Sequence, residues 1–174
     1  TDEGFSLVFF GLMLSSPNYT VILANSINLG LAVTLFTTLL SLPLAFLLVR
    51  YDFPGKGLLN GLILIPLVLP PFVGAIGMRQ LLARFGSINL LLLQMGVIDQ
   101  PIDWLGGGFW GVVLLEVLHL YPIMYLNLAA ALANVDPTLE EAAKNMGASG
   151  FKLFRTVTFP LMLPGYFAGA IIVF

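Results

Sequence analysis

The chain has 174 residues, of which 59% are hydrophobic and 9% charged, with a formal net charge of −2 and no cysteine. Soluble domains carry about 25% charged residues, so this composition and a mean hydropathy of +1.00 place the chain among membrane proteins. Disulfides, thiol catalysis and cysteine-ligated metal are excluded, the single histidine excludes multi-histidine metal sites within this chain, and no basic run suggests nucleic acid.

The hydrophobic runs predict an all-α, multi-pass helical bundle. Residues 1–18 hold an apolar piece, 5–14, that is too short to span and is expected to be an interfacial helix or the tail of a missing span. Residues 19–49 carry no charge and predict a first spanning helix. Asn25 and Ser26 near its start are expected either to join a translocation path or to contact neighbouring helices, and packing is the favoured interpretation.

The second predicted span, residues 57–78, contains prolines near its middle. A proline costs about 3 kcal/mol inside a soluble helix, but membrane helices tolerate it where neighbours take up the freed carbonyls. Pro66, Pro70 and Pro71 here, with Pro122 in the third span, are therefore predicted to be hinges for gating or static kinks. The sequence leaves both interpretations open.

Residues 79–105 predict a long outer loop, with a short interfacial helix at 88–95. The third span, 106–133, carries Glu116 and His119, which share one helix face. Ionisable residues at membrane depth are costly and suggest a path or relay, whereas a polar contact between helices is the alternative and favoured interpretation. Two side chains make an incomplete metal site, so none is expected.

A charged gap, residues 134–160, separates the third span from a last apolar run, 161–174, which is shorter than the ~20 residues that a span needs. We therefore expect an internal fragment of a longer membrane protein, with about three full spans and one truncated span. Lys and Arg counted in alternate loops place the gap in the cytoplasm. The outer side has Arg79 and Arg84, and the gap side has Arg50, Lys56, Lys144, Lys152 and Arg155.

The charged gap predicts two short amphipathic helices joined at a glycine. Asp136 can cap a helix that starts at Pro137, and Gly147 can end it in the left-handed conformation. Glu140 and Lys144 have the i,i+4 spacing of an ion pair. The opposite face is a predicted apolar stripe of Leu139, Ala142, Ala143 and Met146.

The second helix of the gap is expected to be capped by Ser149 and to carry Phe151 and Phe154, with Pro160 beginning the next apolar run. The two helices should form a compact bent unit. A helix lying on the lipid surface is the alternative, but such helices are usually rich in Lys and Arg on the polar face, which fits this segment poorly.

One motif in the gap is specific. Glu141-Ala142-Ala143, Gly147, Val157 and Phe159-Pro160 follow the signature E-A-A, three residues, G, nine residues, I-x-L-P. In this the chain resembles the permease subunits of type I, binding-protein-dependent ABC importers. Val157 replaces Ile and Phe159 replaces Leu, and both replacements are apolar.

The resemblance implies part of an importer transmembrane domain in the inner or plasma membrane: a permease, not an enzyme. Its cytoplasmic coupling helix would seat in an ABC ATPase dimer, which would bind ATP and Mg because this chain has no G-x-x-x-x-G-K-[ST] sequence. No cofactor is expected on the chain itself. Further implied partners are a periplasmic or lipid-anchored substrate-binding protein, a second permease half or subunit, and the lipid bilayer. The implied coupling residues are Glu140, Glu141, Ala142, Ala143, Gly147, Phe151, Phe154 and Pro160.

Two further stretches, 118–122 and 163–170, resemble ferric-iron importer permeases. Many of these fuse two homologous halves in one chain, so this chain could be one half. Ferric iron is therefore the first expected substrate, with phosphonate, thiamine, sulfate or molybdate, and polyamine as alternatives. Functions of another class are a membrane-embedded enzyme with Glu116 and His119 as acid and base, and a structural membrane subunit.

Overall fold

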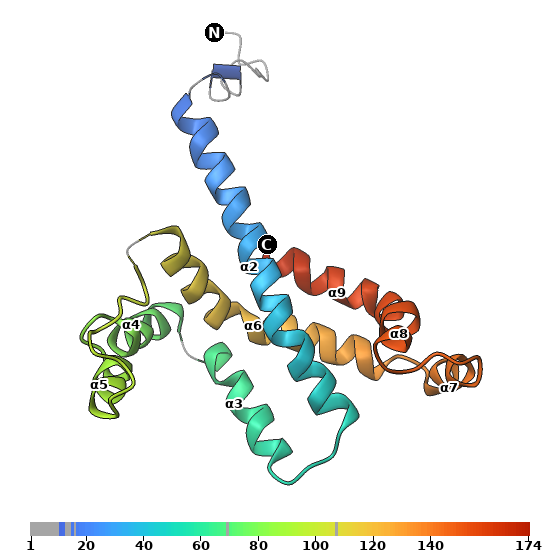
Figure 1. Cartoon of the computed structure of the whole chain (residues 1–174). Helices are drawn as coiled ribbons and strands as arrows, with labels where there is room; N and C mark the ends of the chain where they lie inside the picture. The colour runs from blue at the N-terminus through green and yellow to red at the C-terminus, as the bar shows by residue number, and fades with distance from the viewer. Residues whose placement is uncertain (1–10, 13–14, 16, 69, 107) are drawn as a thin grey trace.

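The computed structural model describes residues 11–12, 15, 17–68, 70–106 and 108–174, and every regular element in them is helical (Figure 1). This confirms the predicted all-α class; most of the apolar piece 5–14 lies outside the described residues. The elements, in chain order, are α2 (Pro17–Arg50), α3 (Lys56–Val68), α4 (Pro71–Leu82), α5 (Ser87–Gln94), α6 (Phe109–Ala133), α7 (Pro137–Asn145), α8 (Gly150–Leu153), the π turn η1 (Phe154–Thr158) and α9 (Phe159–Val173).

Helix α2 is the longest element, with 34 residues. Its N-terminal part, 17–28, is exposed and projects away from the other helices (Figure 1). Packing begins at Gly30, and the buried positions then recur every three or four residues, which is the spacing of one helix face. That buried face consists of Gly30, Val33, Thr37, Ser41, Ala45 and Leu48.

The predicted second span, 57–78, is divided between two helices in the structure. The helical segments Lys56–Val68 and Phe72–Gln94 meet at an angle of 113°. The break falls at Pro70, which adopts an extended backbone (φ −54°, ψ 138°), because a residue that precedes a proline is disfavoured in the helical region. Pro66 lies inside α3 and Pro122 inside α6, so neither of these ends a helix.

The last helix begins earlier than the apolar run suggests. α8, η1 and α9 form one helical stretch, Gly150–Val173, of 24 residues. Lys152 and Arg155 interrupt the apolar run in the sequence, but both side chains are exposed and leave the helix unbroken. The predicted truncated span 161–174 is thus the second part of a helix that starts in the charged gap and is long enough to cross a membrane.

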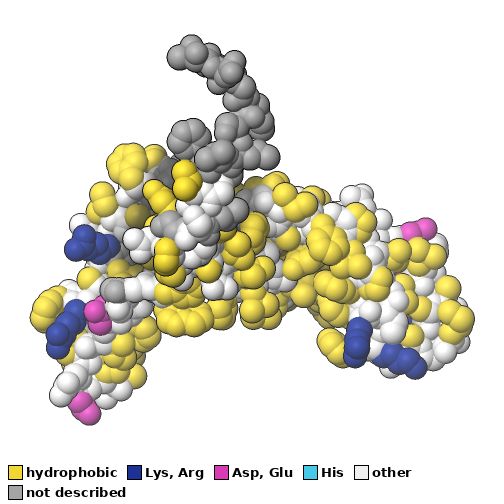
Figure 2. Space-filling view, turned by 90° about the horizontal axis from the view of Figure 1, so that it is seen from above, with side chains coloured by type: hydrophobic (Ala, Val, Ile, Leu, Met, Phe, Trp, Pro, Cys, Tyr) yellow, Lys and Arg dark blue, Asp and Glu magenta, His cyan; other side chains and the backbone are white. Residues whose placement is uncertain are grey.

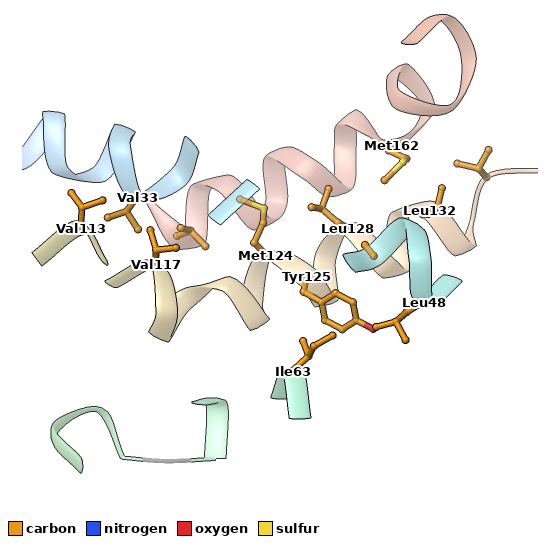
Figure 3. Close-up of a cluster of buried hydrophobic side chains, with 13 residues drawn as sticks. Val33, Leu48, Ile63, Val113, Val117, Met124, Tyr125, Leu128, Leu132 and Met162 are labelled. Carbon is orange, nitrogen blue, oxygen red and sulfur yellow. The ribbon is translucent and has the colours of Figure 1, made fainter. Parts of the chain in front are cut away.

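The core lies where α2, α6 and α9 pack together, with α3 against α6 (Figure 3). Met124, Leu128 and Met162 are fully buried there. Glycines bring α9 close to α6: a Cβ added at Gly165 would lie 2.5 Å from the Cβ of Ala131. Small residues four apart, here Gly165 and Gly169, allow this close approach of helices in membranes.

Three helices among the described residues are long and apolar enough to cross a membrane: Pro17–Arg50, Phe109–Ala133 and Gly150–Val173. The bent pair α3–α4/α5 would make a fourth. Charged side chains gather at the two ends of the visible face, and hydrophobic side chains cover its middle (Figure 2). The α4–α5 segment and α7 lie at opposite ends of α6 (Figure 1). This distribution of charge fits a membrane protein.

Candidate coupling site

Helix α7 is the first helix of the charged gap, and it begins where its local sequence predicts. Pro137 is the first helical residue, and the backbone N–H of Thr138 donates to Asp136 Oδ1 at 2.9 Å. Hydrogen bonds from the backbone and the side chain of Thr138 favour the ionised carboxylate and lower the pKa of Asp136. The predicted cap is therefore confirmed.

After α7 the chain turns at two glycines with positive φ, Gly147 and Gly150. Gly147 has φ +88°, and its N–H donates to the carbonyl of Lys144 at 2.9 Å, while the N–H of Ala148 donates to the carbonyl of Ala143 at 3.0 Å. This pair of bonds is the Schellman arrangement that ends helices at glycine. Gly150, with φ +52°, turns the chain again into α8. Ser149 takes the predicted N-cap position, but its side chain makes no capping hydrogen bond.

The exposed surface of this unit includes several apolar side chains among polar and charged ones. Leu139 is 48% exposed, Met146 83% and Phe151 75%, and Ala142 is exposed between them. We call these four residues the docking face; Glu141 is exposed beside it. The predicted stripe is divided, because Ala143 points inward and is 5% exposed.

Glu140 lies on the inward side of α7, and its ion-pair partner is different from the predicted one. Arg50 Nη2, at the end of α2, donates to Glu140 Oε1 at 2.6 Å, and Thr158 Oγ1 donates to the same oxygen at 2.7 Å. The expected pair with Lys144 is absent from the described ion pairs. Burial explains the difference, since a carboxylate taken out of water needs a charged partner and hydrogen bonds at the same place.

The aromatic residues of the second helix have different environments. Phe154 is half-buried and packs edge-on against Phe46 of α2, with ring centroids 6.0 Å apart, and against Phe159 at 5.7 Å. Phe151 is exposed and touches Phe154. Pro160 lies in the first turn of α9 and is exposed. Phe154 therefore joins the unit formed by residues 137–158, the candidate coupling unit, to α2, whereas Phe151 is exposed on its surface.

The structure brings Glu116 and His119 to one cavity. The cavity has a volume of 420 Å³ and lies between α3, α4 and α6, with Pro66 and Met78 also in its wall. No hydrogen bond or ion pair joins Glu116 to His119 among the described residues, and a polar contact of these residues with another helix stays a prediction. No group of three or more His, Cys, Asp or Glu in the described part could hold a metal ion.

Asn25 and Ser26 are not brought to this cavity. Both are exposed on the projecting part of α2, well before the first buried position of that helix. They contribute neither to the core nor to the cavity wall.

Sequence reasoning missed two polar residues that organise the fold. In the sequence Arg50 is only a loop charge, whereas in the structure it ends α2 and reaches Glu140. Asn89, in the expected interfacial helix, is fully buried; its Nδ2 donates to three carbonyls, and its Oδ1 accepts from Ile102 N and Trp104 Nε1. A single asparagine among leucines was the available signal for a buried polar anchor.

Comparison with known proteins identifies the family. Residues 41–174, which include the whole coupling unit, match the binding-protein-dependent transport system inner membrane component. The chain belongs to this family.

Curated relatives carry more detailed names. The chain is 39% identical over 154 residues to the molybdenum transport system permease protein ModB of Haemophilus influenzae, covering 86% of this chain and 65% of the relative. It is 37% identical over 171 residues to the ModB of Escherichia coli, covering 94% and 69%. The spermidine/putrescine transport system permease protein PotB of Haemophilus influenzae is 31% identical over 160 residues, covering 92% and 56%. The chain thus spans somewhat more than half to about two thirds of the length of these relatives.

A solved structure confirms the architecture. The chain superimposes with a TM-score of 0.74 on a bacterial ABC transporter involved in the import of the acidic polysaccharide alginate, at 17% identity, covering 99% of this chain and 62% of that one. At this identity the likeness concerns the fold alone. These relatives give no support to the ferric-iron subgroup, since their names concern molybdenum and spermidine/putrescine.

Proposed function

We propose that the chain is part of a permease subunit of an ATP-driven ABC importer, and that its coupling unit, residues 137–158, docks on a separate cytoplasmic ATPase. One observation carries the proposal. An apolar docking face lies exposed at one end of the bundle, on a unit with defined helix ends, beside the motif residue Glu141. Exposed apolar patches mark protein or membrane contacts, and the charged residues around this one favour a protein partner.

The machine proposed here has several parts outside this chain. An ATPase dimer binds ATP and Mg and moves the coupling unit, which faces the cytoplasm. A substrate-binding protein delivers the substrate on the opposite side, and a second permease half or subunit completes the translocation path. Membership of a binding-protein-dependent transport family supports this assembly. In this assembly the chain itself carries out no chemistry. We therefore do not propose Glu116 and His119 as the acid and base of an enzyme.

The docking proposal is tested by charge reversal in the complete transporter. Glu141→Lys should reduce ATP-driven uptake to background and release the ATPase on purification, because it reverses the charge beside the docking face. Membrane insertion should be unchanged, since the Glu141 side chain is exposed. Asp99→Lys is the matched control, with the same charge change on an exposed residue of the outer loop.

The outcomes separate the functional classes. Normal uptake by Glu141→Lys would contradict the coupling role. A wild-type chain that neither retains an ATPase nor transports would favour a structural membrane subunit.

For the substrate, we propose an oxyanion of the molybdate class. The support is the similarity to two permeases named for molybdenum transport, one of which matches over 94% of this chain. Ferric iron is not retained, because only short sequence stretches suggested it.

A polyamine is the second candidate, and one structural observation favours it. The cavity between α3, α4 and α6 is lined by Glu116 and His119 and by no Lys or Arg. An ionised glutamate in such a wall would attract a cation and repel an oxyanion. Uptake of labelled molybdate, spermidine and ferric iron by the complete transporter decides between them. Glu116→Gln should lower uptake of a polyamine and should raise or leave unchanged uptake of molybdate.

A further inference from the structure

We propose that Glu140 is a positioning residue that fastens the coupling unit to two membrane helices at once, through a clamp formed by Arg50, Glu140 and Thr158. The inference rests on the proposed function, because it describes how that unit transmits movement. Glu140 and the motif residue Glu141 are neighbours in the chain, but their side chains face opposite ways. Glu141 is exposed, whereas Glu140 is 9% exposed.

The first step concerns how α7 is attached. Of its nine residues, Pro137–Asn145, only Glu140 and Ala143 are buried. They are three positions apart and therefore lie on the same side of the helix. Ala143 contributes a single methyl group, so Glu140 makes the large contact between α7 and the rest of the chain.

The second step concerns what Glu140 holds. One carboxylate oxygen accepts from Arg50 Nη2 at 2.6 Å and from Thr158 Oγ1 at 2.7 Å. Arg50 ends α2, a helix long and apolar enough to span, and Thr158 ends η1, directly before α9. The partners lie 90 and 18 positions away in the chain. Movement of α7 is therefore passed to two spanning helices at a single atom.

The third step concerns rigidity. Only 24% of the Arg50 side chain and 12% of the Glu140 side chain are exposed, and Thr158 is 2% exposed. Water screens such a pair less than a surface pair, and its bonds are short and charge-assisted. Charged groups held by two directional bonds resist displacement, which suits an element that must move as one body with its partner.

The test compares uptake with ATP hydrolysis in the complete transporter reconstituted in vesicles. Glu140→Ala should leave the ATPase bound, because the docking face is intact, but should lower the number of substrate molecules taken up per ATP by about tenfold or more. Glu140→Gln keeps the size and one acceptor oxygen, so its loss should be smaller. Thr158→Val replaces the hydroxyl by a methyl group of similar size and should lower the ratio less than Glu140→Ala.

The decisive variant exchanges the charges. Glu140→Arg alone should be at least as defective as Glu140→Ala, because it places two cations together. Glu140→Arg combined with Arg50→Glu should recover uptake per ATP to within about threefold of the wild-type value. Glu141→Gln is the matched neighbour, and it should weaken ATPase binding instead of the uptake-to-hydrolysis ratio.

The results distinguish a failure of the clamp from a failure of the proposed function. An unchanged ratio in Glu140→Ala, or a charge exchange that recovers nothing, overturns the clamp while leaving the permease function intact. If Glu140→Ala does not reach the membrane, the ratios of Glu140→Gln and Thr158→Val decide in the same way. A wild-type complex without ATP-driven uptake overturns the proposed function itself.

Discussion

Each end of α6 is organised around one buried polar side chain, but the two residues are connected differently. At the end beside α4 and α5, called the outer end after the proposed topology, Asn89 makes five hydrogen bonds, and none of its partners lies more than 15 positions away in the chain. At the α7 end, called the coupling end after the proposed function, Glu140 makes two bonds, to partners 90 and 18 positions away.

The difference lies in what each end can transmit. A neutral amide that is satisfied by its own loop closes that loop on itself, so the hydrogen bonds of Asn89 do not themselves connect the outer end to the spanning helices. A buried carboxylate requires a cation, and here the cation comes from the end of α2. The buried polar network of the outer end is thus local, whereas that of the coupling end reaches the end of α2.

The largest expected effect on the difference between the two ends comes from a substitution of Asn89. Asn89→Asp removes the donor that serves the carbonyls of Ala83, Arg84 and Ile102 and places a negative charge among them. Each polar group left unsatisfied costs about 1–3 kcal/mol. Amides in 83–105 should therefore exchange hydrogen at least about 100-fold faster, measured by mass spectrometry.

A matched control is Gln94→Glu, the same amide-to-carboxylate change on an exposed residue of α5. It should leave exchange in the outer end unchanged. Faster exchange in α7 of the Asn89→Asp variant would show that the two ends are coupled and would contradict the comparison.

The second effect concerns the contact of α9 with α6 near the coupling end. Gly165→Ala places a methyl group 2.5 Å from the Cβ of Ala131, and such overpacking costs about 1–3 kcal/mol. Tm in detergent should fall, and amides in α7 should exchange faster while those in 83–105 do not.

Ala131→Gly should restore the Tm of Gly165→Ala, because it removes the opposing methyl group. Gly61→Ala serves as the control, since no atom lies within 4 Å of the added Cβ. A stability loss in the control as large as that of Gly165→Ala would point to glycine itself and not to close packing.

A smaller effect is expected midway between the ends. The hydroxyl of Tyr125 donates to Asn60 Oδ1 at 2.6 Å and connects α6 to α3. Tyr125→Phe should lower the free energy of unfolding in detergent by about 0.6 kcal/mol, the usual size of such bonds in membrane proteins. Asn60→Ala should cost nothing further in the Tyr125→Phe background; an additive loss would argue against the bond.

The smallest effect concerns the start of α7. Asp136→Ala removes the cap on Thr138 N, so the first amides of α7 should exchange slightly faster at neutral pH, while Asp136→Asn, which also caps, should not. Because the pKa of Asp136 is lowered from 3.8, the cap is fully present above pH 3.8 and is lost as the pH falls through the lowered value. The difference between wild type and Asp136→Ala should disappear there; persistence in strong acid would contradict the ionised cap.

The parts of the coupling site that the sequence predicts are those set by neighbours in the chain. Asp136 and Gly147 fix the start and end of α7 through bonds within a few residues. Glu140 shows the limit: Lys144 has the right spacing for a partner, but the fold brings Arg50, which no local pattern encodes.

The spans divide in the same way. Pro70 and Pro71 indicate where a helix can break, but the angle of 113° between the two helical segments depends on the helices around them, so the sequence does not predict it. Hydropathy alone does not predict that the last helix starts before residue 161. Lys152 and Arg155 lower the hydropathy of this stretch, although both side chains are exposed and leave the helix intact.

The π turn η1 between α8 and α9 has a geometric consequence. A π turn holds one residue more than the corresponding α-helical turn, and one residue corresponds to about 100° of rotation about the helix axis. Rewinding Phe154–Thr158 as a regular α-helix with the same number of residues would therefore rotate everything before it, relative to α9, by about that angle. The direction in which Leu139 and Met146 face thus depends on the π form of this one turn.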